Sequence, residues 1–600
     1  MNYTNSGISI PKPSQYSHFT KLSQPIFEIF IRLYESKPEI RSSEILVFLQ
    51  FIHRIKISKS WVNQILSKAG CKRPLGRPPK SYTQAGETLI LKSTETFHSV
   101  ESIGIPFLIT IMEALGLLDV FINTMIENLS VFPNKNIPKS PDSLGKWLRT
   151  IMGMVLDQRI HNFEEAKRSE MPHKELNLER CRQILKALEL QSGLTDQLVD
   201  FFLNFIVNLL GLEKKKTKLT IFIDGHGNPY YTKQTFVSGR MSVTEKIAPG
   251  THTLIVNCDG GYLLFVQPQA VNTHLNDGLL QSCARLKQRL GDRIEIIVVD
   301  RECNGTEINQ FVKEEFGYSI LTGLRANQYN GLDDFNYEWV TKDKFAIGQW
   351  KDKEKRQEDQ RIFLLYPQGD HLYTLVTTSN NSSVHHKALK LQKSRWPFNE
   401  GIIKILVHQF DFNVNAGNGS QYVENPKLIQ CKEDLHKKNQ VVETHIEELK
   451  QKLSQATAGT TRNKTQDSIE NWKIRKKKNI KKYNEAVKDL PEDVKTRQLE
   501  SQGVMSQLKA GMFNVLLFLI QIAFKTKNPL KIGVEKVLDL LTNRGGEIIE
   551  SGKEILFIFN PPDYQEDREV LYQLFVGINK LNLVDPKGRR VRANMASRGH

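Results

Sequence analysis

The sequence has few cysteines and no long hydrophobic run. Its six cysteines lie far apart, at positions 71, 181, 258, 283, 303 and 431, with no CxxC pair and no Cys/His cluster at zinc spacing. A disulfide framework and a structural zinc site are therefore not expected, which is typical of a reducing cytosol. The longest apolar run, Met512 to Phe524, has 13 residues and is interrupted by Asn514 and Gln521. It is too short to span a bilayer and predicts a buried helix.

A signal peptide is also missing, because MNYTNSGISIPKPSQ has no basic segment followed by an apolar core. We therefore expect a soluble intracellular protein. The 600 residues are too many for one core and predict several structural units. Positive charge is abundant: 83 Lys and Arg against 66 Asp and Glu give a net charge of +17. This surplus favours a polyanionic partner, most commonly nucleic acid, and a basic protein without such a partner is the alternative.

The first segments suggest DNA binding. Residues 1–24 are polar and predict a disordered tail, whereas residues 25–70 have a helical pattern that ends in a candidate helix-turn-helix. Ser58 can cap the start of its last helix, and Gly70 can end it. Its outward residues suit contacts to base edges and phosphates: Lys59, Asn63, Gln64 and Lys68. A packing unit of short helices is the alternative.

A basic, proline-rich linker follows at residues 71–94. Arg77 and Lys80 lie in GRPPK, which resembles the core of an AT-hook that lies in a narrow minor groove. A plain basic linker explains the same residues. Residues 95–212 then have apolar stripes at helical spacing, which predict a helical support domain.

The pattern changes to strands from residue 213. LTIFID predicts a strand, and THTLIVNCD and GYLLFVQP predict a hairpin. An amphipathic helix, the buried strand IEIIVVD, another helix and the short strand YSILTG follow. Three strands, a helix, a strand, a helix and a strand is the order of an RNase H-like α/β core, which we place at residues 213–324.

The remaining segments predict additions to this core. A β-rich insertion is expected at residues 325–382, and a return to the core with a helix that carries a glutamate at 383–426. Residues 427–490 are rich in lysine and predict a charged helical hairpin or short coiled coil. Its apolar residues at heptad-like spacing are Leu435, Val442, Ile446, Leu449 and Leu453. The run RKKKNIKK (475–482) could bind phosphates, and a solvated surface helix explains it equally well. Residues 491–600 predict a C-terminal domain with a hydrophobic helix, a strand and a closing helix.

Two aspartates stand at the ends of apolar strands in this core. Asp224 ends LTIFID, and Asp300 ends IEIIVVD. Because the first and fourth strands of an RNase H-like sheet lie side by side, we expect the two carboxylates to meet. Strand transfer on a phosphodiester needs two divalent ions about 3.5–4 Å apart, and two or three carboxylates suffice to hold them. Aspartates that merely cap a turn are the alternative.

The third candidate ligand lies in RWPFNEGIIK. Glu400 is expected in the first turn of a helix, with Lys404 at i+4 on the same face. Glu400 could join the metal ligands while Lys404 and Arg395 hold phosphates, and an ordinary i,i+4 salt bridge is the alternative. Glu302, two residues beyond Asp300, could substitute as a ligand.

These motifs resemble those of bacterial insertion-sequence transposases of the DDE superfamily. RW-x-x-x-E-G-x-x-K is similar to the signature around their third acidic residue, and IDGHGNPYYTKQ and VVDRECNG are similar to the segments around the first and second. GSQYVENPKL and ILFIFNPPDYQEDREVLYQLFVGINKL add to the resemblance, which covers residues 215–600. Two features depart from it. Gly401 replaces the usual asparagine after the glutamate, and Pro397 is acceptable only if the helix begins there.

The resemblance implies an RNase H-like catalytic core between a helical DNA-binding region and a helical C-terminal region. It implies a transposase that cleaves DNA at the ends of a mobile element and joins the strands. The implied catalytic residues and ligands of two Mg²⁺ or Mn²⁺ ions are Asp224, Asp300 and Glu400. The implied DNA contacts in the core are Arg301, Arg395 and Lys404. Double-stranded DNA and a second copy of the chain are the expected partners, in a prokaryotic cytoplasm with the nucleoid, and the 427–490 hairpin is a candidate bridge between copies.

Several alternatives stay open. His226 could orient water or DNA, or it could be an exposed loop histidine; Trp396 could stack on a flipped base, or it could be a core residue. A nuclease that hydrolyses without joining and a DNA-binding protein that has lost activity are the alternative functions. The complete set of carboxylates favours an enzyme, and the candidate helix-turn-helix favours one that finds a particular DNA end.

Overall fold

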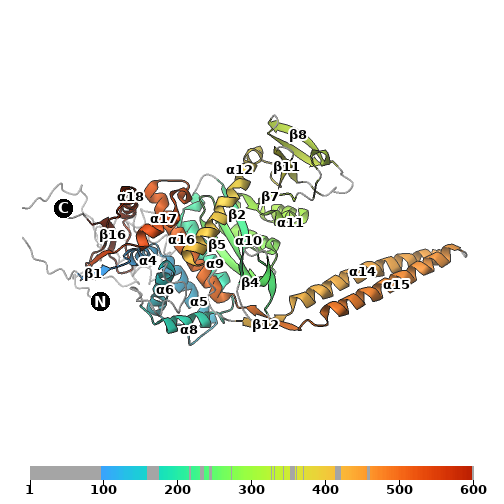
Figure 1. Cartoon of the computed structure of the whole chain (residues 1–600), viewed down its shortest axis with the longest axis horizontal. Helices are drawn as coiled ribbons and strands as arrows, with labels where there is room; N and C mark the ends of the chain where they lie inside the picture. The colour runs from blue at the N-terminus through green and yellow to red at the C-terminus, as the bar shows by residue number, and fades with distance from the viewer. Residues whose placement is uncertain are drawn as a thin grey trace, which may run out of the picture. The chain divides into compact units, whose positions relative to one another are not determined.

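The computed structural model describes most of the chain beyond residue 95 and is mixed α/β, with helices packed on a large mixed sheet (Figure 1). The described residues are 96–157, 175–214, 218–229, 236–241, 246–271, 273–325, 328–329, 331–341, 344–351, 359, 361–368, 371–412, 420–455 and 460–596. The candidate helix-turn-helix and AT-hook lie outside them. So do their candidate DNA contacts, Lys59, Asn63, Gln64, Lys68, Arg77 and Lys80.

The large sheet contains the five strands that the sequence predicted. They are β2 (Leu219–Pro229), β4 (Lys246–Cys258), β5 (Leu263–Ala270), β6 (Ile294–Val299) and β7 (Ser319–Gly323). β2, β4 and β5 pair antiparallel in turn, whereas β6 pairs parallel with β2 on its other side and β7 pairs parallel with β6. The strand order is therefore β5-β4-β2-β6-β7, with the first and fourth strands adjacent as expected.

The predicted helices connect these strands. α10 (Leu275–Leu290) leads from β5 to β6. α11 (Thr306–Phe311), extended by a π-helical turn at Val312–Phe316, leads from β6 to β7. α11 joins the parallel neighbours β6 and β7, which need a crossover of this kind because a tight turn cannot connect them, whereas α10 crosses past β4 and β2 to reach β6.

β2 is longer than the sequence predicted. Its pairing with β6 ends at Ile223, but its pairing with β4 continues from Asp224 to Pro229. The prediction that the strand ends at Asp224 is therefore wrong, because the polar residues after it remain in the hairpin with β4. Asp224 nevertheless marks the position at which β2 separates from β6, and Asp300 directly follows the end of β6.

The predicted β-rich segment continues the sheet beyond β7. β11 (His371–Thr377) pairs with β7, and β10 (Ile362–Gln368), β9 (Phe345–Trp350) and β8 (Phe335–Thr341) follow in antiparallel order. Phe335 and Trp350 stack 4.6 Å apart in a small core of their own. A short strand, β3 (Ser238–Met241), pairs with β4 at the other side.

Two consecutive helices follow the β-rich segment. α12 (Ser382–Phe398) begins at its cap Asn381, whose side chain accepts a hydrogen bond from the backbone N–H of Ser383, and α13 (Glu400–Phe410) follows after one residue. The expectation that a helix begins at Pro397 is wrong. Pro397 lies in the last turn of α12, where the N–H that it lacks removes one hydrogen bond to the carbonyl four residues earlier. Glu400 stands in the first turn of α13, as predicted.

Two long helices form a hairpin in the lysine-rich segment. α14 (Pro426–Gln455) and α15 (Thr460–Val487) run side by side (Figure 1), and the strands β12 (Ser420–Glu424) and β13 (Asp493–Arg497) pair at its base. Contacts from Glu443 to Lys476 and from Asn439 to Asn479 show that the helices are antiparallel. The apolar seam between them contains Val442, Ile446, Leu449, Leu453, Ile469 and Trp472. Four of the five predicted seam residues therefore lie in it.

The helical region predicted at residues 95–212 is also present. Its helices are α4 (Gly104–Ala114), α5 (Leu117–Val131), α6 (Pro141–Leu156), α8 (Leu178–Leu188) and α9 (Leu194–Leu209). A strand that the sequence did not suggest, β1 (Thr96–Val100), precedes them and pairs with β14 (Gly546–Glu550). β14 continues into β15 (Glu554–Phe559) and β16 (Arg590–Met595). The region after residue 95 and the C-terminal region therefore share one sheet.

The predicted hydrophobic helix is α16 (Glu500–Phe524), which packs against β5, α9 and α18 (Gln565–Leu581). By length and composition it could cross a membrane, and so could α4 and α5 taken as one bent span, but 72% of the apolar 18-residue segment of α16 is buried within the protein. Polar side chains of α16 form hydrogen bonds to the backbone of β5. Asn514 exchanges hydrogen bonds of 2.9 and 2.6 Å with the backbone of Leu263, and Gln507 donates to the Val266 carbonyl at 2.7 Å. These side chains satisfy the free edge of β5.

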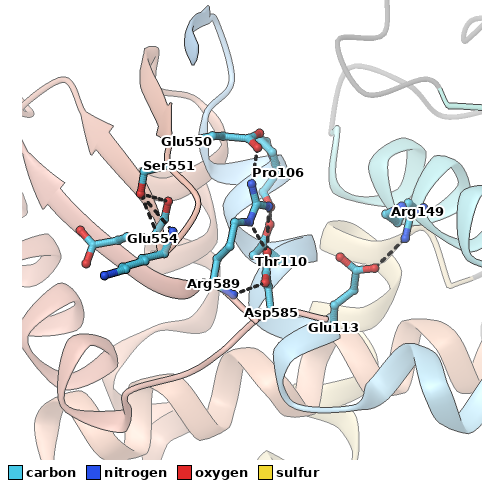
Figure 2. A network of polar contacts seen from close by, with 10 residues as sticks. Pro106, Thr110, Glu113, Arg149, Glu550, Ser551, Glu554, Asp585 and Arg589 are labelled. Atoms are coloured by element: carbon cyan, nitrogen blue, oxygen red, sulfur yellow. Dashed lines mark hydrogen bonds and ion pairs between the residues drawn. The ribbon is translucent and has the colours of Figure 1, made fainter. Parts of the chain in front are cut away.

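Ion pairs stabilise the sheet formed by β1, β14, β15 and β16, and another ion pair links two of the helices beside it (Figure 2). Arg589 pairs with Asp585 at 2.8 Å and also with Glu550, and Figure 2 shows it between the two carboxylates. Arg149 of α6 pairs with Glu113 of α4 at 2.6 Å. Burial raises the pKa of Glu113, and the Arg149 cation opposes that rise. α17 (Val534–Thr542) completes this region.

Candidate active site

Asp224 lies on β2 where the strand separates from β6, and its side chain is only 15% exposed. Oδ2 accepts hydrogen bonds from Arg395 Nη1 at 2.8 Å and from Asn399 Nδ2 at 3.3 Å, and Oδ1 accepts one from the Gly225 N–H at 2.9 Å. Burial raises the pKa of Asp224 to about 6, and the neighbouring Asp300 adds to this, whereas Arg395 and the hydrogen-bond donors lower it. Burial is therefore the stronger effect.

Arg395 joins the two predicted aspartates. Its Nη1 lies 2.8 Å from Asp224 Oδ2, and its Nη2 lies 3.1 Å from Asp300 Oδ1. The Arg395 side chain is 16% exposed, and that of Asp300 is 34% exposed. The strand order thus brings the carboxylates close enough to share one cation, although 76 positions separate them in the sequence. In this structure that cation is the guanidinium group.

Glu400 stands beside the same charges. Burial raises the pKa of Glu400, Arg395 lowers it and Asp300 raises it, so the glutamate is within electrostatic reach of both. In the described part of the chain, however, no three His, Cys, Asp or Glu side chains come close enough to hold one metal ion. The structure therefore brings Asp224 and Asp300 together and places Glu400 nearby, without joining all three in a single ligand group.

Two asparagines that the sequence analysis did not identify hold this arrangement. Asn257 of β4 is fully buried, and its Nδ2 donates to the Phe398 carbonyl at 2.5 Å and to Asn399 Oδ1 at 2.8 Å. Because its oxygen is occupied in this way, Asn399 directs its own amide N–H toward Asp224. Asn257 is the neighbour of Phe222, whose ring lies 5.2 Å from that of Phe398. The strands β2 and β4 are thus linked to the junction of α12 and α13.

The sequence contains a weak signal for each asparagine. Asn257 is a polar residue within the apolar strand segment LIVNC, and a buried amide requires a hydrogen-bond partner. Asn399 directly precedes Glu400. Neither signal reveals the partner, because residues 257 and 399 meet only through the tertiary fold.

Of the predicted DNA contacts that lie in the described residues, Arg301 and Lys404 are exposed, whereas the Arg395 side chain is only 16% exposed. Arg301 follows Asp300 in a 3₁₀ turn, and Lys404 lies one helical turn after Glu400. Trp396 is 64% exposed, so the alternative that it is a core residue is wrong. Its position near the end of α12 leaves the ring available to a ligand.

Two further candidates have other surroundings. His226 is not an exposed loop histidine: it lies on β2, is 6% exposed and has its ring 6.4 Å from that of Phe412. Glu302 lies 3.4 Å from Nε2 of His274 and is half-exposed. Glu302 therefore pairs with His274, whereas Arg395 pairs with the two aspartates.

The donor set fits a hard divalent cation. Mg²⁺ is usually held in proteins by one or two carboxylates together with water and substrate phosphates. Asp224 and Asp300 provide two carboxylates that already share a cation, since Arg395 contacts both within 3.1 Å. A metal ion held by both would take the place of the guanidinium, and Glu400, which is within electrostatic reach of Arg395 and Asp300, could add a further oxygen ligand.

Comparison with known proteins does not place the chain in a family: no protein-family model matches it, and a search of curated proteins finds no match. Its function has to be inferred from the fold and the site.

Proposed function

We propose that the chain is a transposase with an RNase H-like core, which cleaves DNA at the ends of a mobile element and joins the strands with Mg²⁺ or Mn²⁺. The observation that carries the proposal is the pair Asp224 and Asp300, which share one cation where two adjacent parallel strands separate. The strand order β5-β4-β2-β6-β7, with three antiparallel strands followed by two parallel ones, supports the assignment of the core.

Each residue of the site has a role in this proposal. Asp224 and Asp300 would hold the metal, and Glu400 would complete the set from the first turn of α13. When bound, the metal ions activate the attacking oxygen and stabilise the leaving oxygen of the phosphodiester. Arg395 leaves the aspartates and contacts a phosphate, for which its planar fork of donors is suited. The exposed Arg301 and Lys404 bind neighbouring phosphates.

Charge and composition support a DNA substrate. The net charge of +17 favours a polyanionic partner, and a site for phosphodiester chemistry needs one. A transposase must also hold two DNA ends, so we expect a dimer or larger assembly on DNA. The N-terminal candidate helix-turn-helix would select the end sequence.

The test is cleavage and joining of DNA that carries both ends of the genomic segment encoding the chain, with Mg²⁺ or Mn²⁺. Asp300→Asn and Glu400→Gln should each abolish both products while end binding remains. Glu302→Gln is the matched control, because Glu302 lies in the same turn as Asp300 but pairs with His274, and it should stay active. Cleavage without joining would favour a nuclease, and end binding without cleavage by the wild-type protein would favour an inactive DNA-binding protein.

A further inference from the structure

The helix α15 carries a dense group of positive charges. From Lys473 to Lys482 it has seven Lys or Arg residues in ten positions, and no Asp or Glu. Over the whole helix nine basic residues oppose three acidic ones, a difference of six positive charges. Repulsion between these charges destabilises the helix, because like charges four residues apart lie next to each other on its surface.

Most of these lysines point away from α14. Trp472 lies in the seam, Lys476 pairs with Glu443, and Asn479 contacts Asn439, so this side of α15 faces its partner helix. At about 3.6 residues per turn, the opposite side contains the positions one and two residues later in each turn. Lys477 and Lys478 follow Lys476 in this way and Lys481 follows Asn479, whereas Lys482 lies at the flank of this side. All four are exposed, and we name them the α15 lysine face.

Acidic side chains scarcely neutralise this face. Lys481 has only a long contact of 3.9 Å with the exposed Glu485. Within the described residues, no carboxylate forms an ion pair with Lys477, Lys478 or Lys482. Three of the four cations are therefore available to an external anion.

The spacing of the face suits a nucleic-acid backbone. Lys477 and Lys481 form one row and Lys478 and Lys482 another, with about 6 Å between members because four residues rise 1.5 Å each. This separation is comparable to that between neighbouring phosphates along one DNA strand, and the flexible lysine side chains can adjust to it. The nearby Arg475 guanidinium lies 4.7 Å from the Trp472 ring centroid, which keeps this basic side chain against the helix surface.

We propose that the α15 lysine face binds the phosphate backbone of duplex DNA, independently of sequence. This inference rests on the proposed function, which supplies DNA as the substrate, and it assigns the hairpin as a second DNA-binding surface away from Asp224 and Asp300. Contacts of this kind position a duplex, whereas base contacts elsewhere select the sequence.

A second copy of the chain is a poorer occupant of this face. The apolar seam that a coiled coil would use is already filled by α14 and α15 packing on each other. The large apolar side chains exposed around the lysines are Ile474 and Ile480, 49% and 40% exposed, and they do not form a continuous stripe. Two lysine faces brought together would also repel each other.

The test is DNA affinity of the full-length protein as a function of salt, measured by fluorescence anisotropy on a duplex carrying one element end. The variant replaces Lys477, Lys478, Lys481 and Lys482 with Ala. The slope of log K against log salt should become less steep by about 0.9 for each lysine that contacts a phosphate, so by about 3 to 4 in total. The matched control replaces four exposed lysines of α14, Lys437, Lys438, Lys450 and Lys452, and removes the same charge.

An unchanged slope in the α15 variant would overturn the inference, and so would an equal decrease in both variants, which would indicate a general field of charge. Loss of a dimer in sedimentation with no change of slope would identify the face as a contact between copies instead. Circular dichroism should show the same helix content in all three proteins. The proposed function is tested independently, because metal-dependent cleavage by the wild-type protein can be present or absent whatever the salt slopes of the variants are.

Discussion

Asp224 should make the folded protein less stable as pH rises through the mildly acidic range. Burial raises its pKa to about 6, against an ordinary value of 3.8. Between these values the folded state keeps a proton that the unfolded state has released, so the free energy of unfolding falls as pH increases. A difference of about 2.2 pH units, at about 1.36 kcal/mol each, amounts to about 3 kcal/mol. Asp224→Asn cannot titrate and should lack this decrease.

The assay is urea unfolding of both proteins between pH 4 and 7, with EDTA present to remove divalent ions. Subtracting the variant's free energy of unfolding from that of the wild type cancels the contributions of unchanged groups. The difference should fall by about 3 kcal/mol from about pH 4 to just above pH 6 and then level off. Glu302→Gln, at an exposed carboxyl, controls for loss of a negative charge near the site. A difference that is constant or rises with pH would refute the reasoning.

Three further predictions concern neighbouring groups. Arg395→Met should destabilise the metal-free protein by about 3 kcal/mol at pH 7.5, because it leaves two carboxylates without their shared cation. Excess Mn²⁺ should restore most of that loss in urea unfolding, and no response to Mn²⁺ would contradict the shared site. Asn257→Leu should cost about 1–3 kcal/mol by leaving the Phe398 carbonyl unsatisfied, and an unchanged urea midpoint would show that the amide link is not needed. Burial lowers the pKa of Lys509 to about 8 from 10.5, so wild-type stability should rise by about 3 kcal/mol between those pH values. The free energy of unfolding of Lys509→Met should lack this rise, and an equal pH dependence in the wild type and the variant would contradict the prediction.

Local patterns were sufficient to predict the core elements. Apolar runs that end in an acidic residue located Asp224 and Asp300, and the order of strands and helices predicted which strands are adjacent. The apolar residues of the hairpin predicted its seam, from Val442 to Leu453. These features depend on residues close together in the chain, so they can be predicted from the periodicity of apolar residues.

Contacts between distant segments could not be predicted in the same way. The extension of β2 beyond Asp224 depends on its register with β4, and the pairing of β1 with β14 joins residues about 450 positions apart. Arg395 was expected to contact phosphate, but its contact with both aspartates requires the end of α12 to lie over the sheet. Asn257 likewise acquires its role only when β4 packs against the junction of α12 and α13.

Mn²⁺ binding to the full-length protein without DNA tests most directly whether Asp224 and Asp300 share a divalent metal ion. Electron paramagnetic resonance of free Mn²⁺ during a titration gives the affinity independently of any catalytic activity. We predict that Asp224→Asn and Asp300→Asn each weaken binding by at least roughly tenfold, whereas Glu302→Gln leaves it unchanged. Equal Mn²⁺ affinity in the wild-type protein and both aspartate variants would contradict the account.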